Sequence, residues 1–336
     1  MTLHIHPEAV VTPRGNTATD RQLRLRCPEC QTGVGILGDF EATSTRVMVC
    51  RGCGYRLSCS DGVVQALTAE RAAHFDQFMV EYQVVRAAEG RGSDSSDYYL
   101  ALPYRDLSRI NQAQWDIRAR TFRYLERVLI PNLENRHKSV MNILDLGAGN
   151  GWLSYRMALR GHSPVAVDLL TDNRDGLGAA IHFGKSLTSL FPRVQAELDN
   201  LPFEDSQFDA AIFNASFHYS ENFQKTLAEA IRCLRPGGRI IVADTPWYSR
   251  EESGERMLME RRSAFRERFG FPSDAIESLE FLTTERLLRL ERQFGLQWKV
   301  YSPFYGMRWA LRPLIARLHN RREPSRFRIY VAEADK

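Results

Sequence analysis

Short hydrophobic segments alternate with helical patterns in the second half of the chain, from residue 139 onward. The hydrophobic segments predict strands at Met141–Leu146, Val165–Asp168, Val194–Glu197, Phe208–Asn214, Arg239–Asp244, Leu296–Tyr301 and Arg326–Val331. Helical spacing of apolar residues occurs between them, at Trp152–Arg160, Gly178–Leu190, Gln224–Leu234, 250–270 and 283–294. This alternation predicts an α/β fold, with a doubly wound, mostly parallel seven-stranded sheet and helices on both faces.

Changes in the hydrophobic and polar pattern divide the chain into four parts. They are a loose N-terminal arm at 1–22, a small domain of short strands at 23–67, a helical linker and lid at 68–138, and the doubly wound domain at 139–336 with helical insertions at 247–294 and 303–325. A first linker helix is expected where apolar residues recur at helical spacing, at Phe75, Phe78, Met79 and Tyr82. A second, from Trp115 to Leu129, should end at Pro131. Four aromatic residues are candidates for a lid over a ligand: Tyr98, Tyr99, Tyr104 and Trp115.

Composition excludes some classes of protein. Of the 336 residues, 43% are hydrophobic and 26% are charged, which is ordinary for a globular protein. A net charge of +4 is too small by itself to indicate a nucleic-acid partner. The sequence has no apolar run of transmembrane length and no secretory signal pattern at its start. We therefore expect a cytoplasmic protein, whose oligomeric state the sequence leaves open.

Two pairs of cysteines carry the strongest signal of the N-terminal part. Cys27-Pro-Glu-Cys30 and Cys50-Arg-Gly-Cys53 share the Cys-x-x-Cys spacing. In a cytoplasmic chain such pairs indicate metal ligands rather than disulfides, and four thiolates suit one zinc ion. Because four cysteines leave no open coordination position, the sequence predicts one structural zinc ion per chain.

Three glycines follow the first predicted strand of the doubly wound domain, in Asp145-Leu-Gly147-Ala-Gly149-Asn-Gly151. A glycine-rich turn at the carboxyl end of a strand lets a nucleotide-like ligand approach the backbone. The second strand ends in Asp168, whose carboxylate is suited to the two hydroxyls of a ribose. A dinucleotide fold would instead favour the spacing Gly-x-Gly-x-x-Gly.

Neighbouring motifs decide between these readings. The motifs DLGAGNG, VAVD, LPFEDSQFD and LRPGGRIIV occur in this order, a pattern that closely resembles class I S-adenosylmethionine-dependent methyltransferases of the type 11 kind. Residues 23–67, with LRCPEC, VCRGCGY and SDGVV, resemble the small zinc-ribbon proteins that activate tRNA, rRNA and protein methyltransferases. The sequence is therefore interpreted as a methyltransferase with an N-terminal zinc ribbon.

The resemblance implies roles for single residues. Asp145, Gly147 and Gly149 should lie at the methionine end of S-adenosylmethionine, and Asp168 at its ribose. Glu197 and the Leu198 amide should lie near the adenine, with Asp199 as a rival to Glu197. Asn214 should lie beside the sulfonium. Gly151 can instead serve helix packing, and Asp145 can merely cap the turn.

A catalytic base is needed only where the acceptor carries a proton that it does not lose unaided. His218, four residues beyond the fourth strand, is the first candidate for this role, and a packing role is its alternative. Asp244, at the end of the fifth strand, is the second candidate. Precise positioning of the reactants can supply much of the catalysis without either residue.

The acceptor is not defined by the sequence, and we favour a small molecule. The segment Arg308–Arg328 holds seven arginines and one acid, which suits a solvated face, an RNA backbone, an anionic small molecule or a membrane surface. Pro313 weakens it as one continuous helix. An RNA methyltransferase is the first alternative, although NASFHY stands where an Asn-Pro-Pro-Tyr-type motif would lie. A non-catalytic scaffold that binds the cofactor is the second.

Overall fold

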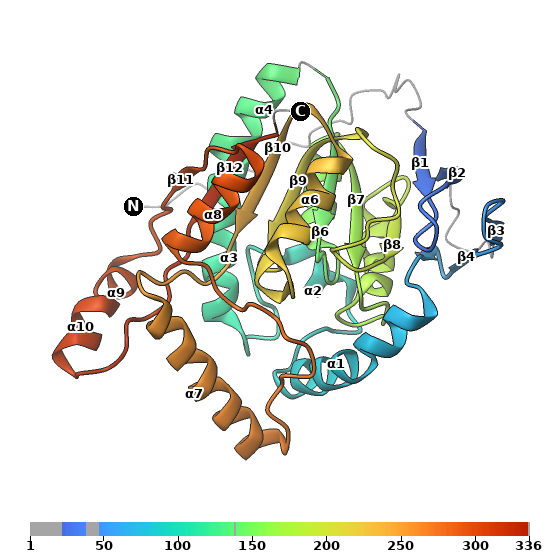
Figure 1. Ribbon diagram of the computed structural model, residues 1–336. Coiled ribbons are helices and arrows are strands. Elements are labelled where there is room, and N and C mark those ends of the chain that lie inside the picture. The colour runs from blue at the N-terminus through green and yellow to red at the C-terminus, as the bar shows by residue number, and fades with distance from the viewer. Residues whose placement is uncertain (1–21, 38–46, 138, 335–336) are drawn as a thin grey trace, which may run out of the picture.

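The computed structural model describes residues 22–37, 47–137 and 139–334, so the predicted loose arm lies almost wholly outside the described residues. Figure 1 shows one central sheet with helices packed around it. Ten strands form this sheet in the order β11-β12-β10-β9-β6-β7-β8-β5-β4-β3. Two further strands, β1 (Leu23–Arg26) and β2 (Gly33–Leu37), form an antiparallel pair of their own.

Seven strands of the sheet belong to the predicted doubly wound domain. They are β6 (Asn142–Leu146), β7 (Ser163–Asp168), β8 (Arg193–Gln195), β9 (Phe208–Asn214), β10 (Leu234–Ala243), β11 (Lys299–Tyr301) and β12 (Ile329–Glu333). Strands β8, β7, β6, β9 and β10 are parallel neighbours, whereas β12 is antiparallel to both β10 and β11. The predicted fold, an α/β domain with a mostly parallel seven-stranded sheet, is confirmed.

The cysteine-rich segment extends the same sheet. Its strands are β3 (Val47–Val49), β4 (Arg56–Ser60) and β5 (Val63–Gln65). Strand β5 pairs in parallel with β8, which would otherwise be the open edge of the methyltransferase-like sheet. Val63 and Val64 are buried in this junction, so the small N-terminal part packs on the larger one through backbone and apolar contacts together.

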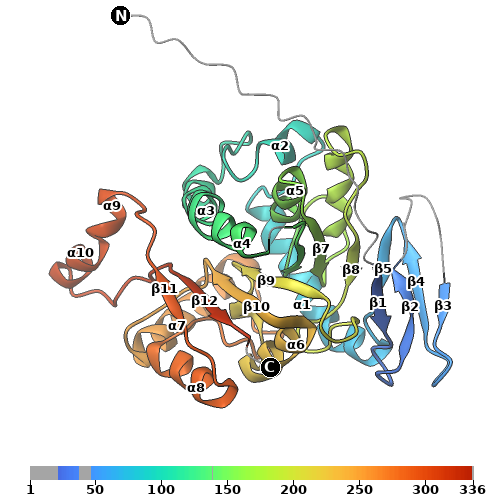
Figure 2. The same cartoon turned by 90° about the horizontal axis from the view of Figure 1, so that it is seen from above.

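Helices cover both faces of the sheet, as Figure 2 shows. They are α1 (Ala69–Ala88), α2 (Ser96–Ala101), α3 (Gln112–Tyr124), α4 (Ile130–His137), α5 (Trp152–Leu159), α6 (Phe223–Cys233), α7 (Glu251–Phe269), α8 (Thr284–Phe294), α9 (Met307–Ala310) and α10 (Arg312–Leu318). Strand β6 is buried along its whole length, and its side chains alternate between two hydrophobic clusters, Ile143 in one and Leu144 in the other. None of the helices described combines the length and apolar character needed to cross a bilayer.

Two helix predictions need correction. Pro131 does not end the helix that begins near Trp115, because a π-helical turn at Leu125–Leu129 leads directly into α4. Pro131 lies in the first turn of α4, where the missing N–H is tolerated. The helix expected at Gly178–Leu190 is a 3₁₀ helix at Leu177–Lys185, a segment that contains two helix-weakening glycines. As predicted, the segment around Pro313 is not one continuous helix: α9 ends at Ala310, and Pro313 lies in the first turn of α10, which begins at Arg312.

Candidate functional site

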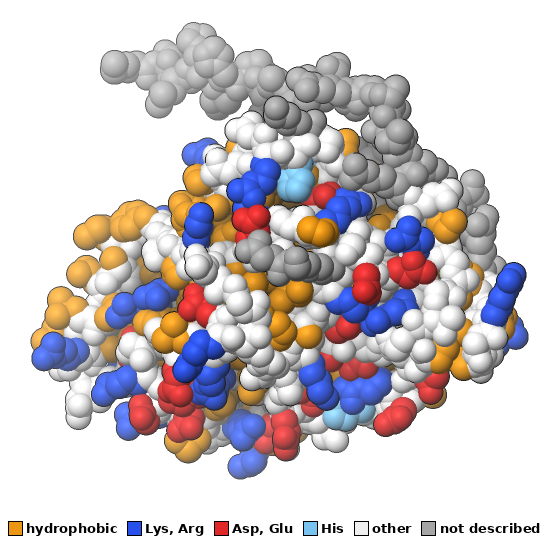
Figure 3. All heavy atoms as spheres, turned by 45° about the horizontal axis from the view of Figure 1, so that its top comes forward, with side chains coloured by type: hydrophobic (Ala, Val, Ile, Leu, Met, Phe, Trp, Pro, Cys, Tyr) orange, Lys and Arg blue, Asp and Glu red, His pale blue; other side chains and the backbone are white. Residues whose placement is uncertain are grey.

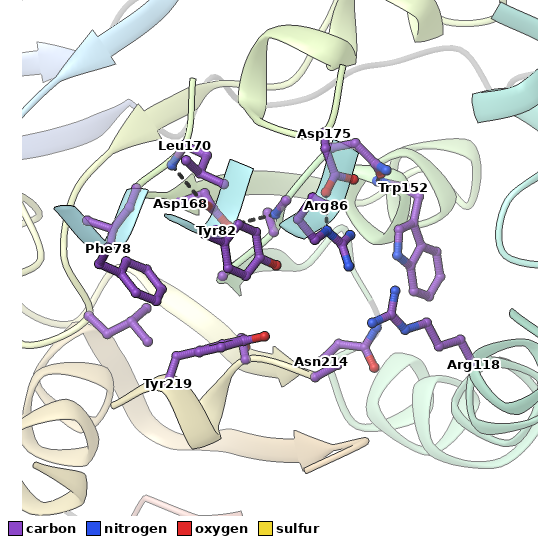
Figure 4. Close-up of a pocket in the computed structure, with 18 of the residues that line it drawn as sticks. Phe78, Tyr82, Arg86, Arg118, Trp152, Asp168, Leu170, Asp175, Asn214 and Tyr219 are labelled. Atoms are coloured by element: carbon purple, nitrogen blue, oxygen red, sulfur yellow. Dashed lines mark hydrogen bonds and ion pairs between the residues drawn. The ribbon is translucent and has the colours of Figure 1, made fainter. Parts of the chain in front are cut away.

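A pocket lies at the carboxyl ends of the parallel strands, beneath helix α1 (Figure 4). Its walls come from α1, α3, the glycine-rich loop and the segments that follow β7, β8 and β9. The space between these walls, including the open mouth, is about 840 Å³. The pocket therefore lies where doubly wound sheets bind nucleotide-like ligands, outside the carboxyl ends of the parallel strands.

The glycine-rich loop after β6 has left-handed backbone at each of its three glycines, with φ of 71° at Gly147, 56° at Gly149 and 79° at Gly151. A Cβ added at Gly147 would lie 2.2 Å from the Ser216 Cβ, and one at Gly151 would lie 3.0 Å from the Phe191 ring. Those two glycines therefore permit close packing within the protein. A Cβ added at Gly149 would lie 3.6 Å from its nearest protein atom, the Asp175 carbonyl oxygen. The space that such a side chain would fill faces the pocket and is left open by the glycine.

Asp168 connects the glycine loop to the end of β7. Its Oδ2 accepts a hydrogen bond from the Gly149 N–H at 2.8 Å, and its Oδ1 accepts one from the Leu170 N–H at 2.9 Å. Burial raises the pKa of this carboxyl to about 6, although the two backbone N–H groups oppose the rise. Asp168 lines the pocket, and each oxygen retains a lone pair for a ligand hydroxyl.

The other predicted acids are engaged by the protein. Asp145 accepts hydrogen bonds from the Ser154 N–H and hydroxyl at 3.1 and 2.8 Å, and burial raises its pKa to about 7. It stands behind the loop and is not among the pocket-lining residues. This bonding matches the alternative in which Asp145 holds the turn, by tying it to α5.

The acids proposed for the adenine end also have protein partners. Glu197 accepts a hydrogen bond from the Arg71 Nε at 2.8 Å, and Asp199 accepts one from the Thr226 hydroxyl. Neither lines the pocket, whereas Leu198 between them does. The roles of Glu197 and Leu198 stay predictions, with Leu198 the better placed of the two.

Helix α1 supplies the wall that the sequence interpretation missed. Phe78, Tyr82 and Arg86 line the pocket, four residues apart, as one stripe of the helix. Arg86 is fixed there by an ion pair with Asp175. Figure 4 shows Tyr82 and Phe78 facing Tyr219 across the cavity, and the rings of Tyr82 and Tyr219 meet edge to face at 5.8 Å. The helical spacing of Phe78 and Tyr82 was visible in the sequence, but nothing there indicated that this stripe faces the cavity.

Three of the four expected lid residues lie elsewhere. Tyr99 is fully buried, donates a hydrogen bond to the Arg174 carbonyl and stacks on the His182 ring. Tyr98 packs against Tyr99 in the core, and Tyr104 donates to Glu126 on the far side of α3. Only Trp115 lines the pocket, so the aromatic lid comes from α1 rather than from residues 98–104.

Arg118 is the pocket cation that the sequence did not single out. Its guanidinium lies 5.0 Å from the centre of the Trp115 ring, and within the described residues it has no hydrogen bond or ion pair with an acid. Burial lowers its pKa, the neighbouring Arg86 and Arg91 lower it further, and Asp244 and Tyr82 oppose them. Figure 4 shows the side chain directed toward Asn214 at the end of β9. Because Arg118 has no hydrogen-bonded acid in the described residues, its charge favours an anionic ligand group in this part of the pocket.

Of the residues after β9, Asn214 and Tyr219 line the pocket and His218 does not. His218 is half-buried, and its Nδ1 is shielded from solvent without a hydrogen-bond partner among the described residues. Burial lowers its pKa to about 4, and Arg261 and Arg118 lower it further while Glu280 opposes them. Its role as a base stays a prediction, now for a group that is a weak base at neutral pH.

Asp244 lies at the end of β10, buried and in left-handed backbone with a φ of 52°. Its Oδ1 accepts a hydrogen bond from the Thr121 hydroxyl at 2.5 Å, while its Oδ2 has no partner among the described residues. Burial raises its pKa to about 6, opposed by Thr121 and by Arg118. Asp244 does not line the pocket itself, so its catalytic role also stays a prediction.

A second cluster lies at the other end of the sheet, where the two Cys-x-x-Cys turns meet. The sulfur atoms of Cys27, Cys30, Cys50 and Cys53 all lie within 4.8 Å of one another. The closest pairs, Cys27 with Cys53 and Cys30 with Cys50, are 3.6 and 3.5 Å apart. A tetrahedral zinc site with Zn–S bonds of about 2.3 Å requires sulfur atoms roughly 3.8 Å apart, which this arrangement approaches.

Comparison with known proteins agrees with this geometry. Residues 144–242 match the family model of a methyltransferase domain. An uncharacterized methyltransferase of Mycobacterium tuberculosis is 34% identical over 113 residues, which are 33% of this chain and 41% of that protein. The ubiquinone/menaquinone biosynthesis C-methyltransferase of Brucella anthropi is 32% identical over 100 residues, 29% of this chain and 38% of that protein. The chain thus spans about two fifths of the length of the curated relatives it matches.

Among solved structures, an S-adenosylmethionine-dependent methyltransferase from Mesorhizobium loti aligns with a TM-score of 0.41 at 20% identity, covering 60% of this chain and 96% of that one. The family match agrees with the resemblance noted in the sequence motifs, since residues 144–242 match the model of a methyltransferase domain.

Proposed function

We propose that this chain, through the class I methyltransferase domain at residues 144–242, transfers a methyl group from S-adenosylmethionine to a small-molecule acceptor. One observation carries the proposal. Asp168 at the end of β7 is fixed by the Gly149 N–H of the glycine loop and lines a pocket closed by the aromatic side chains of α1. A carboxylate in that position suits the ribose of a nucleoside cofactor.

The residues of the pocket fit the cofactor by their chemistry. Asp168 would accept hydrogen bonds from the ribose hydroxyls, and the open space at Gly149 would admit the adjoining part of the ligand. Leu198 and Phe78, on the adenine side, offer apolar contact, and the Leu198 amide offers a donor. Gly147 and Asn214 would lie toward the methionine end, and Asp145 would act indirectly by holding the loop.

When bound, S-adenosylmethionine supplies an electrophilic methyl group on its sulfonium. The protein contributes position and a dry environment. Tyr82, Tyr219 and Trp115 narrow the cavity with aromatic surface, and exclusion of water strengthens every polar contact made inside. Holding the acceptor atom in line is worth up to roughly 7–11 kcal/mol, so positioning carries much of the proposed catalysis.

A proton-bearing acceptor would also need a base. Asp244 has a pKa near the working pH and an oxygen without a partner among the described residues. His218 has a pKa of about 4, and neither residue lines the pocket. These properties favour Asp244 over His218, which reverses the order that the sequence suggested.

The four clustered cysteines support one structural zinc ion per chain. The zinc site would lie at the β3 edge of the sheet. Its cysteines belong to the turns between β1 and β2 and between β3 and β4. Zinc would supply folding energy there and no chemistry, because four thiolates leave no open position.

A small-molecule acceptor is favoured over RNA. The pocket is lined by half-buried aromatic side chains of α1 and by the buried Trp115 of α3, a setting typical of small-molecule sites. A Brucella anthropi relative is named for C-methylation in ubiquinone and menaquinone biosynthesis, and that chemistry comes to this chain only as a proposal.

The experiment is incubation of the full chain with methyl-labelled S-adenosylmethionine and fractionated cell extract. We expect label in the small-molecule fraction, and no transfer by the Arg118→Met variant, whose side chain fills a similar volume without the charge. Label in RNA would replace the small-molecule proposal with the RNA alternative. Cofactor binding with no label in any fraction would favour the non-catalytic scaffold.

A further inference from the structure

Helices α9 and α10 form a protrusion on the body of the molecule, which we define as residues 302–322. Figures 1 and 2 both show it projecting away from the sheet beyond α3. Its base is anchored by aromatic contacts. The Trp309 ring stacks on Phe327 at 5.5 Å and lies 5.7 Å from Tyr305, whose hydroxyl bonds with that of Thr121 on α3 at 2.8 Å. The protrusion is therefore a fixed part of the fold.

The protrusion presents an apolar face to solvent. Its large side chains are exposed by between 44 and 76%: Phe304, Met307, Leu311, Leu314, Ile315 and Leu318. On α10, Leu314 and Leu318 are four residues apart and so lie on one face of that helix, while Met307 lies on the shorter α9 and Leu311 at the junction between the two. Figure 3 shows hydrophobic side chains gathered at the left edge of the molecule, where the protrusion lies. In a globular protein such a face normally packs on the core.

The charge of the protrusion is entirely positive. Residues 302–322 contain five arginines and no acid. Arg322 is paired with Glu260 of α7, whereas the exposed Arg308, Arg317 and Arg321 have no ion pair in the described part of the chain. Arg312 lies over the Trp309 ring at 3.9 Å and contributes to the anchor. Exposed leucines rimmed by unpaired arginines are the pattern of an interfacial helix on an anionic bilayer.

We propose that the protrusion docks this protein on the surface of membranes that carry anionic lipid headgroups. Leu314 and Leu318 insert at the boundary of headgroups and acyl chains, while Arg317 and Arg321 remain among the phosphates. The proposal does not depend on the methyl-transfer reaction.

Charge and surface chemistry select this partner over two others. A nucleic acid would pair with the arginines but leave the aliphatic face exposed to water, because RNA recognition relies on phosphate contacts and aromatic stacking. A second copy of the chain would cover the aliphatic face but bring two sets of unpaired arginines together. An anionic lipid surface satisfies the apolar and the cationic side chains at once.

The test is co-sedimentation of the full chain with vesicles of phosphatidylcholine alone and of phosphatidylcholine with phosphatidylglycerol. We expect binding to the anionic vesicles, weakened by salt. Replacing two arginines, in Arg317→Gln with Arg321→Gln, should weaken it about 30-fold, since each basic residue near an anionic surface contributes about a factor of five. Leu314→Asn with Leu318→Asn should weaken it on the order of tenfold, because the apolar contribution is lost.

The control is Arg51→Gln with Arg56→Gln, which removes the same charge from exposed positions of the cysteine-rich segment on the opposite side of the molecule. This pair should leave vesicle binding unchanged. All these side chains are exposed, so thermal unfolding should stay near that of the parent protein. Equal loss in the control and the Arg317/Arg321 variant would overturn the proposal, as would binding that ignores both double substitutions. Salt-sensitive RNA binding through the same arginines, or a dimer lost in the Leu314/Leu318 variant, without vesicle binding would also overturn it.

Discussion

Asp244→Asn should make the protein more stable at neutral pH and less active. The folded pKa of Asp244 is raised from 3.8 to about 6, chiefly by burial, so the folded state binds this proton more tightly than the unfolded state. Below pH 4 the carboxyl is protonated in both states and carries no penalty. As pH rises through 6 the folded protein must ionise a buried group, and stability is lost. A shift of about two units at about 1.4 kcal/mol each corresponds to about 3 kcal/mol, an upper bound.

Asparagine is the replacement that best isolates the charge of Asp244. Its amide oxygen can still accept the Thr121 hydroxyl, and asparagine tolerates the left-handed backbone found there. Only the charge is removed. We therefore expect the variant and the parent protein to have similar free energies of unfolding near pH 4, with the variant gaining up to about 3 kcal/mol by pH 7.

The assay is chemical denaturation of both proteins between pH 4 and 7, followed by turnover measurements. A stability difference that does not change with pH would refute the reasoning, because it would show that the carboxyl does not titrate differently in the folded state. If Asp244 is the base, turnover should also fall roughly 100-fold, while cofactor affinity stays near that of the parent protein.

Three further predictions concern the other predicted site residues. Asp168→Ala should weaken S-adenosylmethionine binding by roughly 10- to 100-fold in calorimetry, since a charged acceptor contributes about 1.5–3 kcal/mol. It should also lower the melting temperature of the ligand-free protein, because the Gly149 and Leu170 N–H groups lose their acceptor; an unchanged affinity would refute the ribose assignment. Elemental analysis of protein purified without added metal should find one zinc per chain. Chelation should lower the stability of the whole sheet, because β5 pairs with β8, and a zinc content near zero in protein of full stability would refute the metal site. His218→Ala should leave cofactor affinity unchanged and lower turnover less than Asp244→Asn; a larger loss for His218→Ala would restore the order that the sequence suggested.

The sequence determined the architecture because the relevant signals are local. Buried strands such as β6 and β9 read as continuous apolar runs, and the glycines of the loop mark where backbone must adopt left-handed conformations. Asp168 could be assigned from its place at the end of the second strand. Four cysteines in two short turns likewise predict a metal site, because each Cys-x-x-Cys turn brings two sulfur atoms together by itself.

The tertiary structure decided what depends on packing between distant segments. Helix α1 read as an amphipathic helix, but only its position over the carboxyl ends of the strands makes Tyr82 and Arg86 pocket residues. The pKa values of His218 and Asp244 follow from burial, which no motif encodes. The hydrogen-bond partners of Asp145, Glu197 and Asp199 likewise depend on tertiary packing and are not encoded by a local motif.

The cysteine-rich segment and the protrusion show the same division. The sequence predicted the short strands of the first and the basic, amphipathic character of the second. Whether an edge strand pairs with another strand, or an apolar helix face packs against the core, depends on surfaces that form only when the chain folds. Strand β5 meets the open edge of β8, so the small domain becomes part of the large sheet. The apolar face of α9 and α10 remains exposed to solvent, on a protrusion whose base is fixed by the aromatic contacts of Tyr305 and Trp309.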